Sequence, residues 1–222
     1  MFERAERELV EMADIVIVPT PALAGRFEDW GADVRLVPHG VTLFPWQTQG
    51  GSDGGVKIGF VGTLDFRIDA EVLEHVAISE PNWNISLVGP VQRGFPEARL
   101  RRLPNLSILP PVPHAEVGYT LRRFSVGIMP YFDHPFYQGM SPLKLLEFFA
   151  AGKPVVARPT AALEPFSQWL CFATTPAEFL EQIRHVLSHD SADRAQERRQ
   201  VAEANSWDLR HAQLVQLLEE LS

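Results

Sequence analysis

Residues 139–157, GMSPLKLLEFFAAGKPVVA, form a strongly apolar segment that contains one lysine and one glutamate close to its start. Lys144 and Glu147 are three residues apart, so on a helix they lie on the same side. Ser141 suits the N-cap position and Pro142 the first helical position. A helix that begins there presents free backbone N–H groups, which favour an anion, most often a phosphate.

The lysine is the informative residue of this pair. In the first turn of a helix its charge opposes the helix dipole, which is unfavourable unless an anion lies nearby. Glu147, one turn further on, can pair with Lys144 or accept hydrogen bonds from hydroxyl groups of a ligand. The alternative interpretation is an ordinary ion pair between residues i and i+3 on a half-exposed helix.

The loop before this helix, residues 130–142, is long for a strand-to-helix connection, and long loops in compact domains are often functional. Gly139 allows a close approach of the backbone to a ligand. The loop is also rich in groups that suit a polar ligand: Tyr131, Asp133, His134, Tyr137 and Gln138.

Short apolar runs alternate with helical patterns over most of the chain. We expect strands near residues 57–62, 84–88, 106–109, 125–129, 154–157 and 170–173, with helices between them and three closing helices at about 176–188, 192–204 and 206–221. Strands that are apolar throughout and separated by helices indicate a parallel sheet covered on both faces. The fold class is therefore α/β, a doubly wound, Rossmann-like sheet.

In this architecture a ligand binds at the carboxyl ends of the strands, where the strand order reverses. With the usual order, the loops after the first and fourth strands, residues 62–69 and 130–142, flank that crevice. The loop 130–142 leads directly into the Lys144–Glu147 helix, so the pattern places the two charges at the expected ligand site.

A shorter helix–strand–helix–strand pattern precedes this domain and packs, we expect, as an appendage. The segment QTQGGSDGG, with four glycines, marks a flexible connection. We divide the chain into residues 1–48, the end of an N-terminal domain and an inter-domain segment; 49–55, a glycine-rich linker; 56–205, the Rossmann-like domain; and 206–222, a closing helix.

Composition narrows the class of protein further. The net charge of −8 among 222 residues argues against a general nucleic-acid binder. Cys171 is the only cysteine, which excludes an intramolecular disulfide. The charged N-terminus is not a secretory signal, and no apolar run approaches the roughly 20 residues needed to span a bilayer. We expect a cytoplasmic protein and leave its association with the inner face of the membrane open.

Several enzyme classes lack their signature residues here. The sequence contains no G-x-S-x-G, no Walker loop and no G-x-G-x-x-G, so a nicotinamide enzyme is not favoured. His185 and His189 are the one histidine pair at helical spacing, and no carboxylate joins them at ligand spacing. We therefore predict no metal site.

Four segments in order resemble the nucleotide-sugar glycosyltransferases of GT-B fold, family 4-like, and most closely a bacterial branch with teichuronic-acid-type transferases. They are ADIVIVPTPALAGRF with VRLVPHGV, then VKIGFVGTLDFRID, PNWNISLVGP, and SPLKLLEFFAAGKPVVA; the terminal NSWDLRHAQLVQLL also fits. The resemblance covers nearly the whole chain and implies the C-terminal, donor-binding half of a GT-B enzyme.

This resemblance implies roles for the site residues. Glu147 would bind the ribose hydroxyls of the donor, and Lys144 would compensate the diphosphate charge. Arg67 is a second candidate for the cation that would compensate the diphosphate. The alternative is that Arg67 is an ordinary, solvated surface arginine. His114 would lie near the nucleobase, or is simply the first residue of a helix. The remaining donor-binding candidates are Gly62 and Thr63 in the first loop, Gly139, and the backbone around Met140, Ser141 and Leu143.

Two departures from the family pattern limit what the resemblance implies. Many members carry a second glutamate eight positions before the ribose glutamate, where this chain has Gly139. The resemblance therefore does not imply whether transfer retains or inverts the configuration of the sugar. A GT-B enzyme also needs an N-terminal acceptor domain. This chain contains only what resembles the last helix, strand and helix of that domain. We expect that domain to be the missing partner of this chain, and catalytic residues stay unassigned.

We therefore expect the donor half of a retaining-type glycosyltransferase that binds a UDP or GDP type sugar nucleotide, uses no cofactor or essential metal, and is inactive without an acceptor domain. The alternatives are a GT-B-fold sugar-nucleotide epimerase and a non-catalytic module that binds a nucleotide or a partner.

Overall fold

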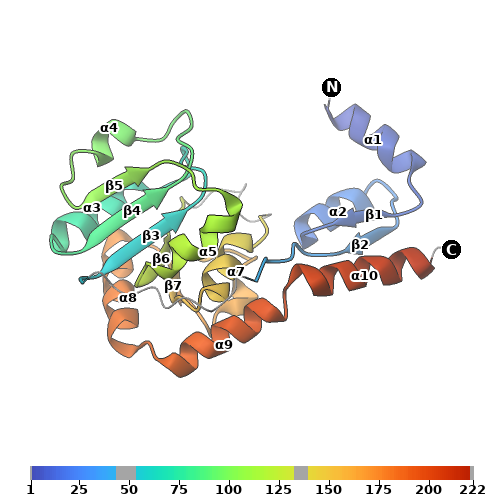
Figure 1. Cartoon of the computed structure of the whole chain (residues 1–222). Coiled ribbons are helices and arrows are strands. Elements are labelled where there is room, and N and C mark those ends of the chain that lie inside the picture. The colour runs from blue at the N-terminus through green and yellow to red at the C-terminus, as the bar shows by residue number, and fades with distance from the viewer. Residues whose placement is uncertain (1, 44–53, 133–139, 221–222) are drawn as a thin grey trace.

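The computed structural model describes residues 2–43, 54–132 and 140–220. An N-terminal unit contains α1 (Phe2–Met12), β1 (Val16–Val18), α2 (Pro21–Glu28) and β2 (Val34–Leu36). The larger domain begins with β3 (Lys57–Val61), α3 (Ala70–Ser79), β4 (Asn84–Val88), α4 (Glu97–Leu100), β5 (Leu106–Leu109), α5 (His114–Arg122) and β6 (Val126–Met129). It continues with α7 (Leu143–Ala150), β7 (Val155–Ala157), η1 (Glu164–Phe166), β8 (Cys171–Phe172), α8 (Pro176–His189), α9 (Ala192–Glu203) and α10 (Trp207–Glu220) (Figure 1).

The larger domain is built on a six-stranded sheet in the order β5-β4-β3-β6-β7-β8, with every neighbouring pair parallel. This confirms the doubly wound, Rossmann-like α/β fold and the predicted strands. The chain reverses its direction of winding between β3 and β6, where Ile58 of β3 lies opposite Val126 of β6. The crevice expected between the loops after these two strands is therefore at the predicted edge of the sheet.

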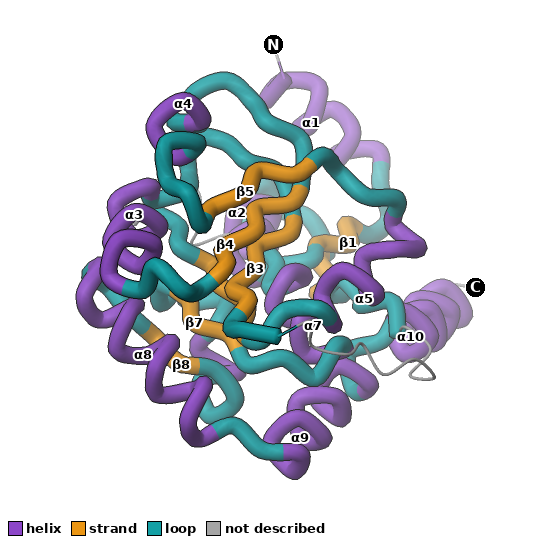
Figure 2. The backbone as a smooth tube through the Cα atoms, turned by 60° about the vertical axis from the view of Figure 1, so that its left-hand side comes forward, coloured by secondary structure: helices purple, strands orange, loops and turns teal. Residues whose placement is uncertain are grey.

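Helices cover both faces of the sheet. On one face α3 packs against α8, and on the other α7 packs against both α5 and α9 (Figure 2). The central strands β6 and β7 are buried along their whole length. This two-sided burial explains why their sequences are continuous apolar runs instead of alternating ones.

Glycines within two central strands let aromatic rings lie directly on the sheet. A Cβ atom on Gly59 would be 2.1 Å from the ring of Phe124, and one on Gly127 would be 2.6 Å from the ring of Phe148. Phe148 belongs to α7 and is 1% exposed. The strand glycine therefore fixes how closely α7, the helix with the two charges, approaches the sheet.

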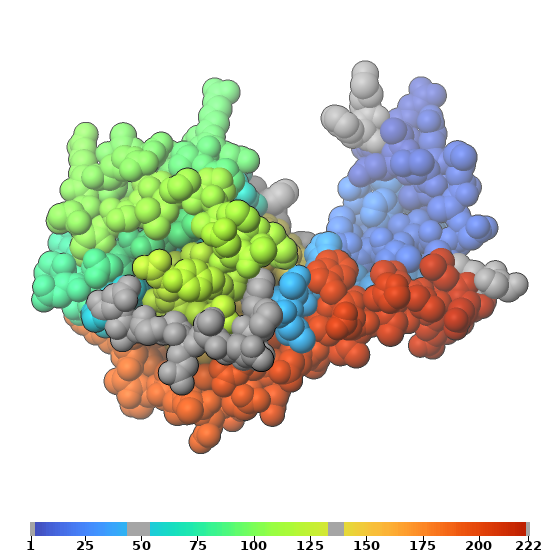
Figure 3. Space-filling view, in the orientation of Figure 1, coloured from blue at the N-terminus to red at the C-terminus, as the bar shows by residue number. Residues whose placement is uncertain are grey.

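The N-terminal unit is separate from the main sheet: β1 and β2 form their own parallel pair. The N-terminal unit is attached through residues 37–43 and by α10. This helix extends from the larger domain and runs beneath the N-terminal unit (Figures 1 and 3). Val41 N–H donates to the Asn205 carbonyl at 2.9 Å, and Trp207 N–H donates to the Val41 carbonyl at 3.2 Å. Most of the predicted linker, residues 49–55, lies outside the described residues.

None of the helices in the described ranges combines the length and the apolar character needed to cross a bilayer.

Candidate functional site

The helix with the two charges begins one residue later than the sequence suggests. Pro142 occupies the N-cap position with φ −77° and ψ 25°, and α7 begins at Leu143. The predictions of Ser141 as N-cap and Pro142 as first helical residue are therefore wrong by one position, because the ψ of Pro142 is not helical. No side chain caps this helix, and the first intrahelical bond is Leu146 N–H to the Pro142 carbonyl at 3.1 Å. Within the part of the chain that the structure describes, the N–H groups of the first turn are thus left for another acceptor.

Ser141 has an unusual environment for a hydroxyl group. Its Oγ is buried and has no hydrogen-bond partner among the described residues. The side chain lines a cavity of about 30 Å³ together with Lys144, Arg158 and Tyr131. A buried hydroxyl without a partner is costly, so an acceptor or donor at this place would be stabilising.

Lys144 reaches from α7 across the end of β3. Gly62 has φ +145°, and a Cβ atom there would lie 2.0 Å from Lys144 Nζ. The ammonium group therefore occupies the space that any other side chain at position 62 would fill, and it lies 5.6 Å from the ring centroid of the buried Phe60. Thr63, the next residue in this loop, is half-buried. The structure thus brings the predicted residues Gly62 and Lys144 into direct contact.

A second glycine supports this loop. Gly89, at the end of β4, has φ +151°, and a Cβ atom on it would be 2.0 Å from the Gly62 carbonyl oxygen. Gly62 N–H in turn donates to the Val88 carbonyl at 2.8 Å. The carboxyl ends of β3 and β4 can lie this close because both residues lack a side chain.

Lys144 and Glu147 do not form the ordinary surface ion pair. Among the described residues, no ion pair within 4.0 Å joins either side chain to a partner. Burial lowers the pKa of Lys144, a shift that Arg67 increases and that the charges of Glu147 and Asp65 oppose. Burial also raises the pKa of Glu147, against the charges of Lys144 and His114. Both groups are therefore partly desolvated without the direct contact that would compensate them.

His114 is the first residue of α5, as the sequence predicts, and its ring is exposed. Its Nε2 lies 3.3 Å from Thr42 Oγ1, in the connection from the N-terminal unit. Its charge also opposes the rise that burial causes in the pKa of Glu147, and α5 packs against α7. The predicted nucleobase role of His114 stays a prediction.

Arg67 is not a solvated surface arginine. Its Nε lies 2.8 and 2.9 Å from the two carboxylate oxygens of Asp65, and its Nη1 lies 3.6 Å from Met140 Sδ. Burial raises the pKa of Asp65, but the hydrogen bonds and charge of Arg67 outweigh it and hold this pKa below its usual value. The Asp65–Arg67 pair thus links the loop after β3 to the approach of α7. Sequence reasoning missed Asp65; its signal was the spacing of Asp and Arg two residues apart in a short loop.

A second missed group ties the two crevice loops together. Arg158, directly after β7, donates from Nη2 to Asp69 Oδ2 at 2.9 Å and from Nε to the Tyr131 carbonyl at 2.5 Å. Asp69 also accepts a hydrogen bond from Glu71 N–H at 3.0 Å and so caps α3. These contacts fix the loops after β3 and β6 against the end of β7.

Several predicted residues lie outside the described residues, so the structure gives no placement for them: Asp133, His134, Tyr137, Gln138 and Gly139. The others form one group at the carboxyl edge of the sheet. Gly62, Thr63 and Arg67 follow the end of β3, and Met140, Ser141, Leu143 and Lys144 lie at or before the start of α7. Glu147 lies one turn further along α7, and His114 begins α5, which packs against α7.

Comparison with known proteins decides the family. Residues 67–216 match the family described as glycosyl transferase-like. The chain belongs to this family. It is 30% identical over 168 residues to the putative teichuronic acid biosynthesis glycosyltransferase TuaH of Bacillus subtilis, a match that covers 72% of this chain and 42% of that protein. The chain thus spans less than half of this curated relative, and the family match does not favour the epimerase alternative.

Solved structures agree on the fold. The sucrose-phosphate synthase of Thermosynechococcus elongatus has a TM-score of 0.77 at 21% identity, covering 97% of this chain and 60% of that one. Anabaena HepE in complex with UDP and glucose has a TM-score of 0.74 at 16% identity, covering 93% and 63%. The parallel sheet matches the Rossmann-like half of GT-B glycosyltransferases, as the sequence resemblance implied.

Proposed function

We propose that this chain is the donor-binding half of a glycosyltransferase and that its crevice holds the nucleoside diphosphate of a sugar nucleotide. Lys144 and the free N–H groups of the first turn of α7 contact the diphosphate, and Glu147 accepts hydrogen bonds from the ribose hydroxyls. The sugar then extends towards the loop after β6. No cofactor or essential metal takes part in this proposal.

The single observation that supports it best is the position of Lys144. A half-buried lysine is placed over Gly62 at an uncapped helix start, beside the unpartnered hydroxyl of Ser141. Burial disfavours its charged form and lowers its pKa. A diphosphate would neutralise the charge of the lysine and would also accept hydrogen bonds from the helix N–H groups and from the Ser141 hydroxyl.

UDP is the first nucleotide to test. HepE has been solved with UDP and with UDP-glucose, and a relative in Burkholderia vietnamiensis is a UDP-forming trehalose-phosphate synthase. These ligands belong to the neighbouring structures, and they are the reason to test UDP on this chain before GDP. The sugar and the acceptor stay unassigned.

Isothermal titration with UDP, GDP and ADP tests the binding proposal. Lys144→Met should weaken binding of the preferred nucleotide about tenfold or more, on the scale of a charge-assisted hydrogen bond. Lys153→Met is the matched control, because Lys153 is also half-buried, with a pKa lowered by burial, but lies beyond the other end of α7. Equal losses in the two variants, or no binding of any nucleotide by the native chain, would contradict the proposal.

We further propose that transfer needs an acceptor domain that packs on the N-terminal unit. The relatives named above are longer than this chain. On the unit, a cavity of about 310 Å³ is lined by apolar side chains that include Leu9, Val10, Ile17 and Phe27, and Met12 is 83% exposed. Such a face suits a further α/β layer beside β1 and β2.

A radiolabelled transfer assay tests this second step. We expect weak nucleotide binding and no transfer by the 222 residues alone, because the acceptor hydroxyl must be positioned against the donor by the other domain. Transfer should appear when an acceptor domain from a family member is joined upstream. Robust transfer by this chain alone would show that the half-enzyme interpretation is wrong. Nucleotide binding without transfer in either form would favour a non-catalytic binding module.

A further inference from the structure

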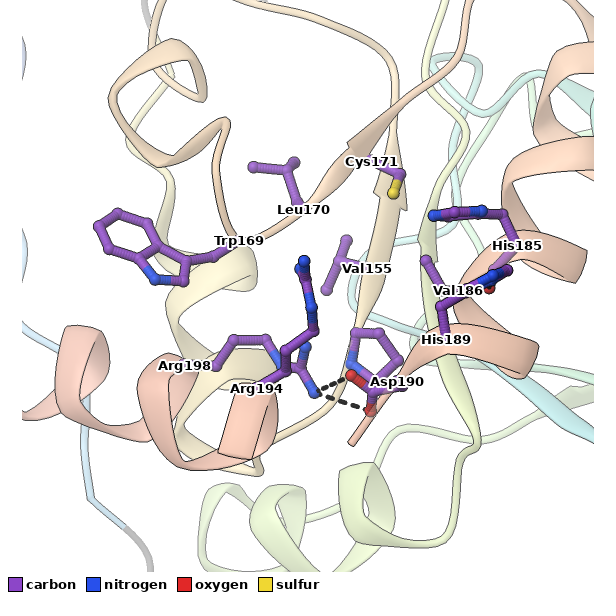
Figure 4. A pocket seen from close by; sticks show the side chains of 11 residues that line it. Val155, Trp169, Leu170, Cys171, His185, Val186, His189, Asp190, Arg194 and Arg198 are labelled. Atoms are coloured by element: carbon purple, nitrogen blue, oxygen red, sulfur yellow. Dashed lines mark hydrogen bonds and ion pairs between the residues drawn. The ribbon is translucent and has the colours of Figure 1, made fainter. Parts of the chain in front are cut away.

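A second cavity of the larger domain, outside the crevice, lies at the opposite edge of the sheet. It has a volume of about 300 Å³ and adjoins Val155 and Cys171, the first residues of β7 and β8. We call it the amino-edge pocket. Helices α8 and α9 form its other walls (Figure 4). The volume is at the lower end of the range for small-molecule sites.

One arginine of this pocket is structural. Arg198 is 2% exposed, and its Nη2 lies 2.8 Å from both carboxylate oxygens of Asp190 and 2.9 Å from the Gly152 carbonyl. These bonds join Asp190, which directly follows α8, to Gly152, which lies just beyond the end of α7. Arg198 therefore uses its donors within the protein.

A second arginine is available to a ligand. Arg194 lies one turn earlier on α9, and its side chain extends into the pocket towards Leu170 (Figure 4). Among the described residues, no hydrogen bond or ion pair engages its guanidinium group, and its backbone N–H donates to Ser191 Oγ at 3.2 Å. Its charge nevertheless reaches across the pocket, because it opposes the rise that burial causes in the pKa of Cys171.

The balance of charge in the pocket is positive, although the chain as a whole is acidic. Arg194 and Arg198 face the single lining carboxylate, Asp190. Lys153, close by, has a pKa lowered by burial and is coupled to both Asp190 and Arg198. Three cationic groups thus share one carboxylate, which favours an anion as ligand.

The remaining walls suit a small organic body. His185 and His189 stack with ring centroids 4.3 Å apart on the α8 side, and His189 Nδ1 is engaged by the His185 carbonyl at 2.9 Å. Trp169, Leu170 and Val186 supply apolar surface. Cationic and ring N–H donors therefore come from two helices, α8 and α9, and a phosphate, with several acceptor oxygens, can accept from both.

We propose that the amino-edge pocket is a second ligand site, separate from the nucleotide crevice, that binds a small phosphomonoester. Arg194 and the ring N–H groups of the histidine pair hold the phosphate, and the organic part lies against Trp169 and Leu170. The Arg198–Asp190 pair forms the floor of the site. Binding does not depend on the occupation of the crevice or on an acceptor domain.

Isothermal titration with glycerol 3-phosphate, inorganic phosphate and glycerol tests this site, in a buffer free of other phosphates. The titrations are carried out on the Lys144→Met variant. This change weakens phosphate binding in the crevice, so the heat measured comes from the amino-edge pocket. We expect glycerol 3-phosphate to bind, and a further Arg194→Gln change to weaken it about tenfold. Arg194 is exposed, so this change should leave folding intact.

Arg184→Gln is the matched control, since Arg184 is an exposed arginine of α8 that pairs with Glu80 and does not line the pocket. It should leave the affinity for glycerol 3-phosphate unchanged. Equal affinity for inorganic phosphate would identify free phosphate as the ligand and still support the anion site. Binding of glycerol alone, no binding at millimolar concentration, or an affinity that Arg194→Gln does not change would overturn the proposal.

Discussion

Two pairs of partly buried charges lie at the two ends of the same helix, and they are organised in opposite ways. At the start of α7, Lys144 and Glu147 are half-buried and have no ion-pair partner within 4.0 Å among the described residues. Beyond its last turn, Arg198 pairs with both oxygens of Asp190 and also bonds the Gly152 carbonyl. Each pair combines one cation with one carboxylate, and only the structure shows which of the two is joined by hydrogen bonds.

The difference separates the proposed binding site from a structural contact. Burial lowers the pKa of Arg198, but hydrogen bonds to Asp190 oppose that shift, so removal of the arginine leaves Asp190 and the Gly152 carbonyl without this donor. Burial also shifts the pKa values of Lys144 and Glu147 towards the neutral forms, and only the charges of nearby groups, with no hydrogen bond, oppose those shifts. A protein that keeps such charges at a cost to stability is expected to use them on a ligand.

The largest effect on stability should come from the structural pair. Arg198→Met should lower the free energy of unfolding by about 3 kcal/mol, because it strands a partly buried carboxylate and the Gly152 carbonyl. Urea unfolding monitored by circular dichroism measures this. Arg194→Gln, one turn away on the same helix, should change it by less than about 0.5 kcal/mol. Similar values for the two variants would remove the distinction between the two ends of α7.

A change at Gly62 should affect both stability and binding. Gly62→Ala forces a Cβ atom into the place of Lys144 Nζ at a φ of +145°, so we expect a loss of about 1–2 kcal/mol from backbone strain. Because the lysine must move, UDP affinity should also fall. Gly25→Ala is the control, since no atom lies within 4 Å of its Cβ position. Unfolding curves and titrations that match those of the native chain would contradict the contact between Gly62 and Lys144.

Glu147 should matter for binding and hardly for folding. Glu147→Gln keeps the shape of the side chain but removes its charge, and should weaken UDP binding by about 1–3 kcal/mol. The melting temperature should stay nearly the same, because no ion pair is lost. Isothermal titration and calorimetric melting measure the two quantities. An unchanged affinity with a reduced melting temperature would instead favour a structural role for Glu147.

The smallest effect expected is a pH dependence of stability at this same residue. Burial raises the pKa of Glu147 in the folded chain above its unfolded value. Its contribution to stability is therefore present below the unfolded pKa and is lost as the pH rises through the raised, folded pKa. The native chain should lose stability relative to Glu147→Gln over that window. A difference that grows in the opposite direction, measured by urea unfolding at several pH values, would show that a partner stabilises the carboxylate.

The sequence by itself determined the fold class, the strands and the helix that carries the site. Continuous apolar runs such as residues 57–62 and 125–129 require burial on both faces, which only a covered parallel sheet provides. The lysine in the first turn of α7 indicated a ligand site, because a cation there is unfavourable without an anion. The loops 62–69 and 130–142 could be placed together because the usual strand order brings them to the same crevice, whereas the position of His114 was implied only by the family resemblance.

Only the tertiary structure decided which charges are compensated. The pairing of Arg67 with Asp65 depends on how one loop turns, and the bonds of Arg158 to Asp69 and Tyr131 join residues 89 and 27 positions apart. The helix start moved by one residue because the ψ of Pro142 is set by its surroundings. The amino-edge pocket joins residues of β7, β8, α8 and α9 that no local pattern relates. Local sequence fixes which residues must be buried, whereas the desolvation and pairing of a charge depend on neighbours that come together only in the folded chain.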